Sequence, residues 1–286
     1  MFAQLFGYYL LKKNILSAQQ LNEALSNMKV YKARLGSLFT DAGYMTREQV
    51  EYVHKEQKHF DKRMGDIAVF LGFLTQEQME ELLYKQNNDD VVLAEALIDK
   101  GYITSAEYEH LIKAYRQEYG LDGKINEKNL ARDIISIFSL EENEHSEIYG
   151  DYLSLFVRNM IRFIGDDFAF SCNTEREESE TEGFISQEIG GHKKIRITVG
   201  GEKSALSAFA ARYSGNSAEL CQYTEAGDFL NLQNELYAAN TLASTGEVLD
   251  ISQQIYSDKD PFWNSDDKIV IPLLFTFGNI YINISA

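Results

Sequence analysis

The sequence predicts a two-domain protein: an all-α domain of four helical-hairpin repeats, followed by an α+β domain with a mostly antiparallel sheet and long helices on one face. Two observations carry this prediction. A phrase of nine residues at 43–51 returns at 72–80, which sets a period of 29 residues in the first part of the chain. After about residue 130 this repeat is absent, and strand-like runs bounded by glycines take its place.

Each copy of the repeat predicts one hairpin, with copies at 14–22, 43–51, 72–80 and 101–109. One helix ends at a residue that tolerates a left-handed backbone. Three residues later a Ser or Thr begins the next helix as the first half of a capping box. The end positions are Asn14, Gly43, Gly72 and Gly101, and the box pairs are Ser17 with Gln20, Thr46 with Gln49, Thr75 with Gln78, and Thr104 with Glu107. Since one hairpin cannot cover its own apolar face, we expect four stacked copies, or two pairs of copies, to form the core.

Composition and charge exclude several classes of protein. Residues 1–120 carry 14 Lys and Arg against 17 Asp and Glu, so −14 of the net charge of −17 lies in 121–286. That half repels a polyanion, and we expect no nucleic-acid binding. Cys172 and Cys221 give no disulfide framework, and no Cys/His cluster predicts a metal site. No apolar run approaches the roughly 18 residues of a membrane span, so we expect a cytoplasmic protein.

The polar segment 119–129 is the predicted linker between a repeat domain at 1–118 and a second domain at 130–286. Within the second domain the residue spacing predicts helices and strands in an α+β order. The predicted helices are 127–138, 146–164 and 224–242, and the predicted strands are 184–189, 193–199, 205–213, 268–277 and 279–285, the last two forming a hairpin at Gly278.

The order of the segments at 205–213 and 226–251 and of the terminal hairpin resembles the CheX/CheC family of chemotaxis phosphatases, over about 140–286. That family carries an acid and an amide, spaced Glu-x-x-Asn, on one exposed helix face. The matching positions are Asp228 and Asn231. A spacing of three places both side chains on the same face of a helix, where both can enter one partner cleft.

The resemblance implies a signalling protein that dephosphorylates a phospho-aspartyl response regulator with a CheY-like receiver domain. Asn231 would orient the attacking water and Asp228 would pair with the regulator's lysine, so catalysis is by positioning. The protein would need no cofactor of its own, because the regulator supplies Mg²⁺. The alternative is a non-catalytic adaptor that binds a receiver domain or another signalling partner through the same helix. A monomer and a homodimer formed through the C-terminal domain both remain open.

The segments 34–57 and 63–86 resemble the MshEN domain at the front of type II secretion ATPases. Some of those domains bind cyclic di-GMP through motifs that begin Arg-Leu-Gly and end in Gln. The matching residues are Arg34, Leu35, Gly36 and Gln57 in the second repeat, and Arg63, Gly65 and Gln86 in the third. Arginine suits a guanine ligand because it can bond O6 and N7 together. Two interpretations stay open: a cyclic di-GMP site that controls the protein, or surface arginines of a helical interaction module.

Overall fold

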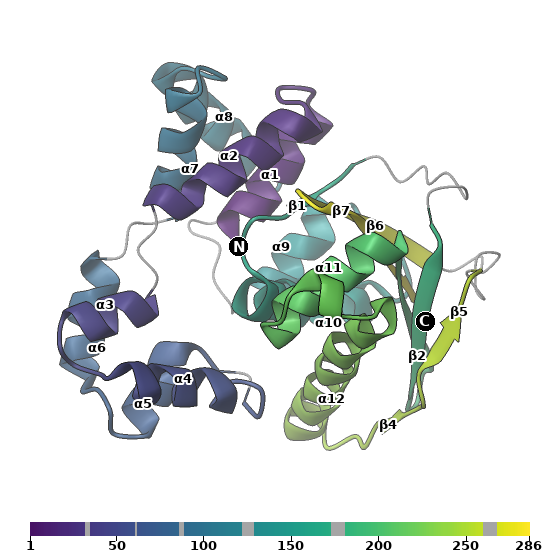
Figure 1. Ribbon diagram of the computed structural model, residues 1–286. Helices are drawn as coiled ribbons and strands as arrows, with labels where there is room; N and C mark the ends of the chain where they lie inside the picture. The colour runs from purple at the N-terminus through teal and green to yellow at the C-terminus, as the bar shows by residue number, and fades with distance from the viewer. Residues whose placement is uncertain (32–34, 61, 86–88, 122–128, 173–180, 260–267) are drawn as a thin grey trace.

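The computed structural model describes residues 1–31, 35–60, 62–85, 89–121, 129–172, 181–259 and 268–286, coloured along the chain in Figure 1. Two residues of the proposed cyclic di-GMP motifs, Arg34 and Gln86, lie outside these ranges. So does most of the predicted linker, 122–128. Among the described helices, none is long and apolar enough to cross a bilayer.

The first part of the chain folds as helical hairpins, and the predicted turns are confirmed. The pairs are α1 (Phe2–Lys12) with α2 (Ala18–Tyr31), α3 (Leu35–Asp41) with α4 (Arg47–Glu56), α5 (Met64–Phe70) with α6 (Gln76–Lys85), and α7 (Asp89–Asp99) with α8 (Ser105–Glu118). The first helix of each pair ends at a positive φ, at Asn14 (55°), Gly43 (72°), Gly72 (73°) and Gly101 (70°). Thr46 and Thr104 each form both hydrogen bonds of a capping box.

The hairpins pack as two pairs, first with fourth and second with third. In the first pair, α7 contacts both α1 and α2. In the second, α3 contacts α6 and α4 contacts α5, around a separate apolar core that includes Phe39, Val53 and Leu82. We call this second pair, 35–85, the inner lobe. Gly65 explains part of its tight packing, since a side chain there would collide with Met79.

The second part of the chain is an antiparallel sheet with helices on one side (Figure 1). Its strands follow the order β1-β6-β7-β3-β2-β4, with β5 also paired to β2, and every described pairing is antiparallel. The strands are β1 (Ala169–Phe170), β2 (Gly183–Gly190), β3 (Ile195–Gly201), β4 (Asp250–Ile251), β5 (Ile255–Ser257), β6 (Lys268–Phe275) and β7 (Gly278–Ser285). The helices are α9 (Leu130–Ile137), α10 (Ser146–Asn159), α11 (Lys203–Ser214) and α12 (Ala226–Thr245), with a π-helical turn η1 (Met160–Ile164) after α10 and two 3-10 turns, η3 (Ala218–Leu220) and η4 (Tyr223–Glu225). The predicted α+β class and the hairpin at Gly278 are thereby confirmed.

One strand prediction is wrong. The segment 205–213 is part of helix α11. Its buried residues Ala205, Leu206, Phe209 and Ala210 recur at helical spacing, which places them together on the face turned to the core. The segment is also rich in alanine, the residue with the strongest helix propensity.

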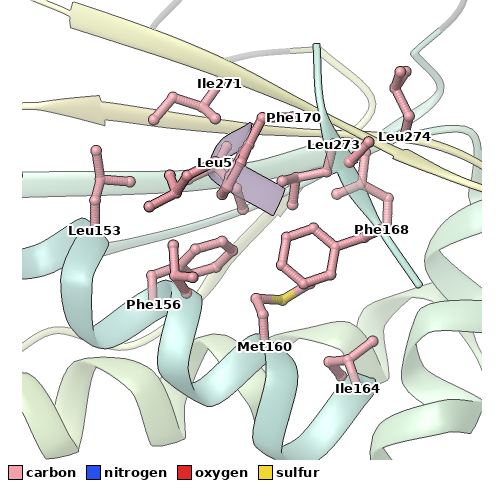
Figure 2. Close-up of a cluster of buried hydrophobic side chains, with 14 of the residues drawn as sticks. Leu5, Leu153, Phe156, Met160, Ile164, Phe168, Phe170, Ile271, Leu273 and Leu274 are labelled. Carbon is pink, nitrogen blue, oxygen red and sulfur yellow. The ribbon is translucent and has the colours of Figure 1, made fainter. Parts of the chain in front are cut away.

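The outer hairpins share one hydrophobic core with the sheet. Figure 2 shows Leu5 of α1 among the side chains of Leu153, Phe156 and Phe170, which come from α10 and β1. Leu5 is fully buried, and the ring of Tyr8 of α1 packs at a tilt against Phe138, with ring centroids 4.8 Å apart. The core therefore runs continuously from the first hairpin into the α+β half. The apolar packing does not divide at 119–129. The domain boundary predicted there therefore stays a prediction.

We predict that two core truncations will act on different parts of the chain. Leu5→Ala should destabilise α1 and the sheet half together, by about 2–5 kcal/mol, because it leaves a cavity in the shared core. Leu82→Ala should loosen only the inner lobe, whose core is separate. Hydrogen exchange followed by mass spectrometry measures both effects. Faster exchange confined to α1 in the Leu5 variant would contradict the shared core.

Candidate functional site

Helix α12 exposes one stripe of polar side chains to solvent. Its apolar residues, including Phe229, Leu230 and Leu236, recur at helical spacing and are buried against α10, α11 and β2. On the opposite side Asp228 and Glu235 are exposed, and Asn231 is half-buried at the edge of the stripe next to β2. We call Asp228, Asn231 and Glu235 the α12 stripe. The two residues predicted from sequence thus lie on one accessible side of the helix.

The side chain of Asn231 is held in one orientation by two hydrogen bonds. Its Oδ1 accepts a bond from Gln187 Nε2 at 2.8 Å, and its Nδ2 donates to Glu235 Oε1 at 2.7 Å. A carboxamide has two N–H donors and two acceptor lone pairs. One donor and one lone pair of Asn231 therefore remain available at the edge of the stripe, and the amide plane is already fixed.

A buried chain of polar side chains sets this geometry. Gln187, on β2 and only 2% exposed, accepts a bond from Asn234 Nδ2 at 2.8 Å. Asn234, fully buried on α12, accepts in turn from the Tyr152 hydroxyl of α10 at 2.7 Å. Gln187 Nε2 also donates to the carbonyl of Ser252 at 2.9 Å. Buried polar groups are costly unless bonded, so this chain favours a single rotation of α12 about its axis.

Two tyrosines flank the stripe, and its carboxylates raise the pKa of each. Tyr213 of α11 lies against Phe229, with ring centroids 5.7 Å apart. Burial raises the pKa of Tyr213, and the carboxylates of Asp228 and Glu235 raise it further. Burial likewise raises the pKa of Tyr256 on β5, with Asp228 the next cause. In the described part of the chain, neither Asp228 nor Glu235 has an ion-pair partner, so both negative charges are available to a cation from outside.

Sequence reasoning missed two members of this site. The first is Glu235, an acidic residue within the predicted helix 224–242. Its spacing of four from Asn231 is the signal that could have found it, since residues i and i+4 are neighbours on a helix. Gln187 is two residues from both Ile185 and Ile189 in the predicted strand, so it shares a face of the sheet with them. A polar residue on an apolar face signals a buried hydrogen bond, although not its partner.

Gln57 and Arg63, two of the residues predicted for cyclic di-GMP, have hydrogen-bond or ion-pair partners within the inner lobe. Gln57 is buried, and its amide donates to the Lys62 carbonyl at 3.2 Å, a bond that holds the α4–α5 turn. Arg63 is exposed and paired with Asp66 at 3.1 Å. Gly65 packs on Met79, while Leu35 and Gly36 belong to α3. Within the described ranges, no group of three or more His, Cys, Asp or Glu could hold a metal ion.

Comparison with known proteins finds similarity at the level of structure. No family model matches the sequence, and no curated protein is similar to it. The chain is similar to a CheC-like superfamily protein from Shewanella sp. PV-4, at 16% identity and a TM-score of 0.38, over 47% of this chain and 96% of that one. It is similar to the chemotaxis protein CheX from Vibrio vulnificus, at 12% identity and a TM-score of 0.38, over 47% and 95%. A CheX–CheY–BeF3–Mg²⁺ complex from Borrelia burgdorferi contains a chain similar at 12% identity and a TM-score of 0.37, over 48% and 96%.

We predict that Gln187→Met will destabilise the sheet half by about 1–3 kcal/mol. It leaves Asn234 Nδ2 buried without an acceptor and removes the donor to Asn231, and an unpaired buried polar group costs about that amount. Chemical denaturation measures the loss. Gln253→Met, at an exposed position after β4, is the matched control and should stay within about 0.5 kcal/mol of wild type. Equal stability of the two variants would show that the network does not hold α12.

Proposed function

We propose that this protein dephosphorylates a phospho-aspartyl response regulator by presenting Asp228 and Asn231 to a CheY-like receiver domain. The observation that carries the proposal is the α12 stripe itself. It places a carboxylate and a pre-oriented carboxamide side by side on an accessible helix. The sequence resemblance described above supplies the reaction class, and the proposal would place the protein in the cytoplasm, where such receivers act.

The chemistry asked of these residues is limited, because the receiver holds the phosphoryl group and Mg²⁺. The free N–H and lone pair of Asn231 can hold a water in line with the phosphorus, at no cost of ordering the amide during the reaction. The Asp228 carboxylate can pair with a lysine of the receiver. The carboxylate of Glu235 lies beside Asn231 and adds negative charge where that lysine would enter.

The length of Asp228 limits the expected rate. Compared with glutamate it is shorter by one methylene, roughly 1.5 Å. A misplacement of about 1 Å can cost on the order of 100-fold in rate. We therefore expect slow turnover by the natural chain.

The decay of a phosphorylated receiver tests this proposal. Wild type should accelerate the loss of phosphate, and Asn231→Ala should remove most of that acceleration, because it removes the carboxamide that would orient the water. Asp228→Glu should increase the rate, because the longer side chain can reach the receiver's lysine. Ser244→Ala, exposed at the far end of α12, is the control and should behave as wild type. A wild type that leaves the decay unchanged would end the enzymatic proposal.

A non-catalytic adaptor is the second candidate, and one observation favours it. The Asn231 amide already uses one donor and one acceptor position in its hydrogen bonds to Glu235 and Gln187. A surface of this kind can bind a receiver domain even if it positions the attacking water poorly. Receiver binding by wild type, weakened by Asp228→Ala but without faster phosphate loss, would identify the adaptor.

Control by cyclic di-GMP is tested separately, by calorimetric titration. The burial of Gln57 and the pairing of Arg63 with Asp66 support the interaction-module interpretation. On that basis we expect no saturable heat with cyclic di-GMP, in wild type or in Arg63→Ala. Saturable binding that Arg63→Ala weakens would instead support the ligand interpretation.

A further inference from the structure

The end of α4 and the turn that follows it carry lysines without carboxylate partners in the described chain. Lys55, Lys58 and Lys62, here called the basic strip, form no ion pair within the described chain. Elsewhere, lysines are often paired, as in Lys13 with Glu118 at 2.7 Å and Lys203 with Asp258 at 2.9 Å. The turn is compact, because the amide of Lys58 bonds the Lys55 carbonyl at 3.1 Å and Gln57 bonds the Lys62 carbonyl. Three lysines thus lie within eight residues, and with Glu56 and Asp61 in the same segment its net charge is +1.

The basic strip lies next to the α12 stripe. Lys58 Nζ sits over the Tyr213 ring, 4.5 Å from its centroid. Tyr213 in turn packs on Phe229 of α12 and lies in the field of Asp228 and Glu235. On the same side of the inner lobe, His54 lies 6.2 Å from Phe163 of η1, centroid to centroid. Any protein that covers the α12 stripe on the Tyr213 side will therefore meet Lys58, the lysine through which the strip borders the stripe.

Exposed aromatic rings accompany these lysines. Phe70 is 73% exposed, and Lys62 Nζ lies 5.5 Å from its ring centroid. Phe60, within the turn, is 44% exposed. Aromatic side chains are enriched at protein–protein interfaces relative to the rest of a surface. The strip therefore combines positive charge with apolar area that its own chain leaves uncovered.

The charge of the chain indicates what this surface binds. Residues 121–286 carry −14 of the net −17, so the half that holds the α12 stripe repels an acidic partner. A receiver's phospho-aspartyl site holds Mg²⁺, and Mg²⁺ is held by carboxylates. Its rim is therefore acidic. The basic strip supplies the opposite sign at the border of the stripe, where complementary charge steers encounter and fixes orientation.

We propose that the basic strip and the α12 stripe form one composite docking surface, in which Lys55, Lys58 and Lys62 bind the acidic rim of the protein whose phospho-aspartyl site meets Asp228 and Asn231. This inference rests on the proposed function and adds the partner's second contact. It gives the inner lobe a direct role in binding.

The test is binding of a receiver domain loaded with beryllofluoride and Mg²⁺, chosen as the tightest binder among the receivers of the host. The variant is Lys55→Glu/Lys62→Glu, which spares Lys58 at its contact with Tyr213. The matched control is Lys113→Glu/Lys193→Glu, an equal change of charge at exposed positions on α8 and in the β2–β3 turn. A milder variant, Lys55→Gln/Lys62→Gln, keeps the test interpretable should the double reversal unfold the lobe.

The strip variant should raise the Kd by on the order of 10-fold or more at low salt. Its Kd should also depend less on salt than that of wild type. The glutamine variant should fall between it and wild type, and the control should stay within about twofold of wild type. Equal Kd for strip variant and control would overturn this inference and leave the phosphatase proposal standing. Tighter binding by the strip variant would also overturn it, since the strip would then obstruct the site. If wild type binds no receiver, the proposed function fails and this inference fails with it.

Discussion

The hydrogen-bonded chain from Tyr152 through Asn234 and Gln187 to Asn231 is the constraint on which the rest of this site depends. It joins α10, α12 and β2 through three buried side chains and ends at Asn231, which is half-buried. A rotation of α12 by one residue would break these bonds and leave several polar groups unpaired in the core. The same bonds that hold the helix therefore decide which side chains reach solvent. The structural role of Asn231 and the functional role proposed for it therefore meet in one side chain.

The two parts of the proposed docking surface belong to different hydrophobic cores. The α12 stripe belongs to a body whose core extends from Leu5 of the first hairpin to the sheet. The basic strip belongs to the inner lobe, which has its own smaller core around Phe39 and Leu82. Contacts such as Lys58 with Tyr213 connect the two. A partner that contacts both would bind the sheet half and the inner lobe together. A change in the inner lobe could then alter the affinity for that partner without changing the α12 stripe.

Local features could be predicted from sequence, and non-local pairings could not. Helix ends and caps depend on residues within a few positions, and Gly43 and Thr46 are placed as expected. The four hairpins have similar apolar patterns, so nothing in the sequence says that the first packs on the fourth. The presence of Asp228 and Asn231 on one helix face followed from spacing. The bond from Asn231 to Gln187, which lies 44 positions away, follows from tertiary packing alone.

Side-chain amide NMR of Asn231 and Asn234 tests the central claim most directly, in the free protein and with a beryllofluoride-loaded receiver. Our account predicts slow proton exchange for Asn234 Nδ2 in both states, because that group is buried and bonded. It predicts that the Asn231 Nδ2 resonances shift when the receiver binds, because that amide lies in the contact. A receiver that binds while the Asn231 resonances stay unchanged would contradict the account.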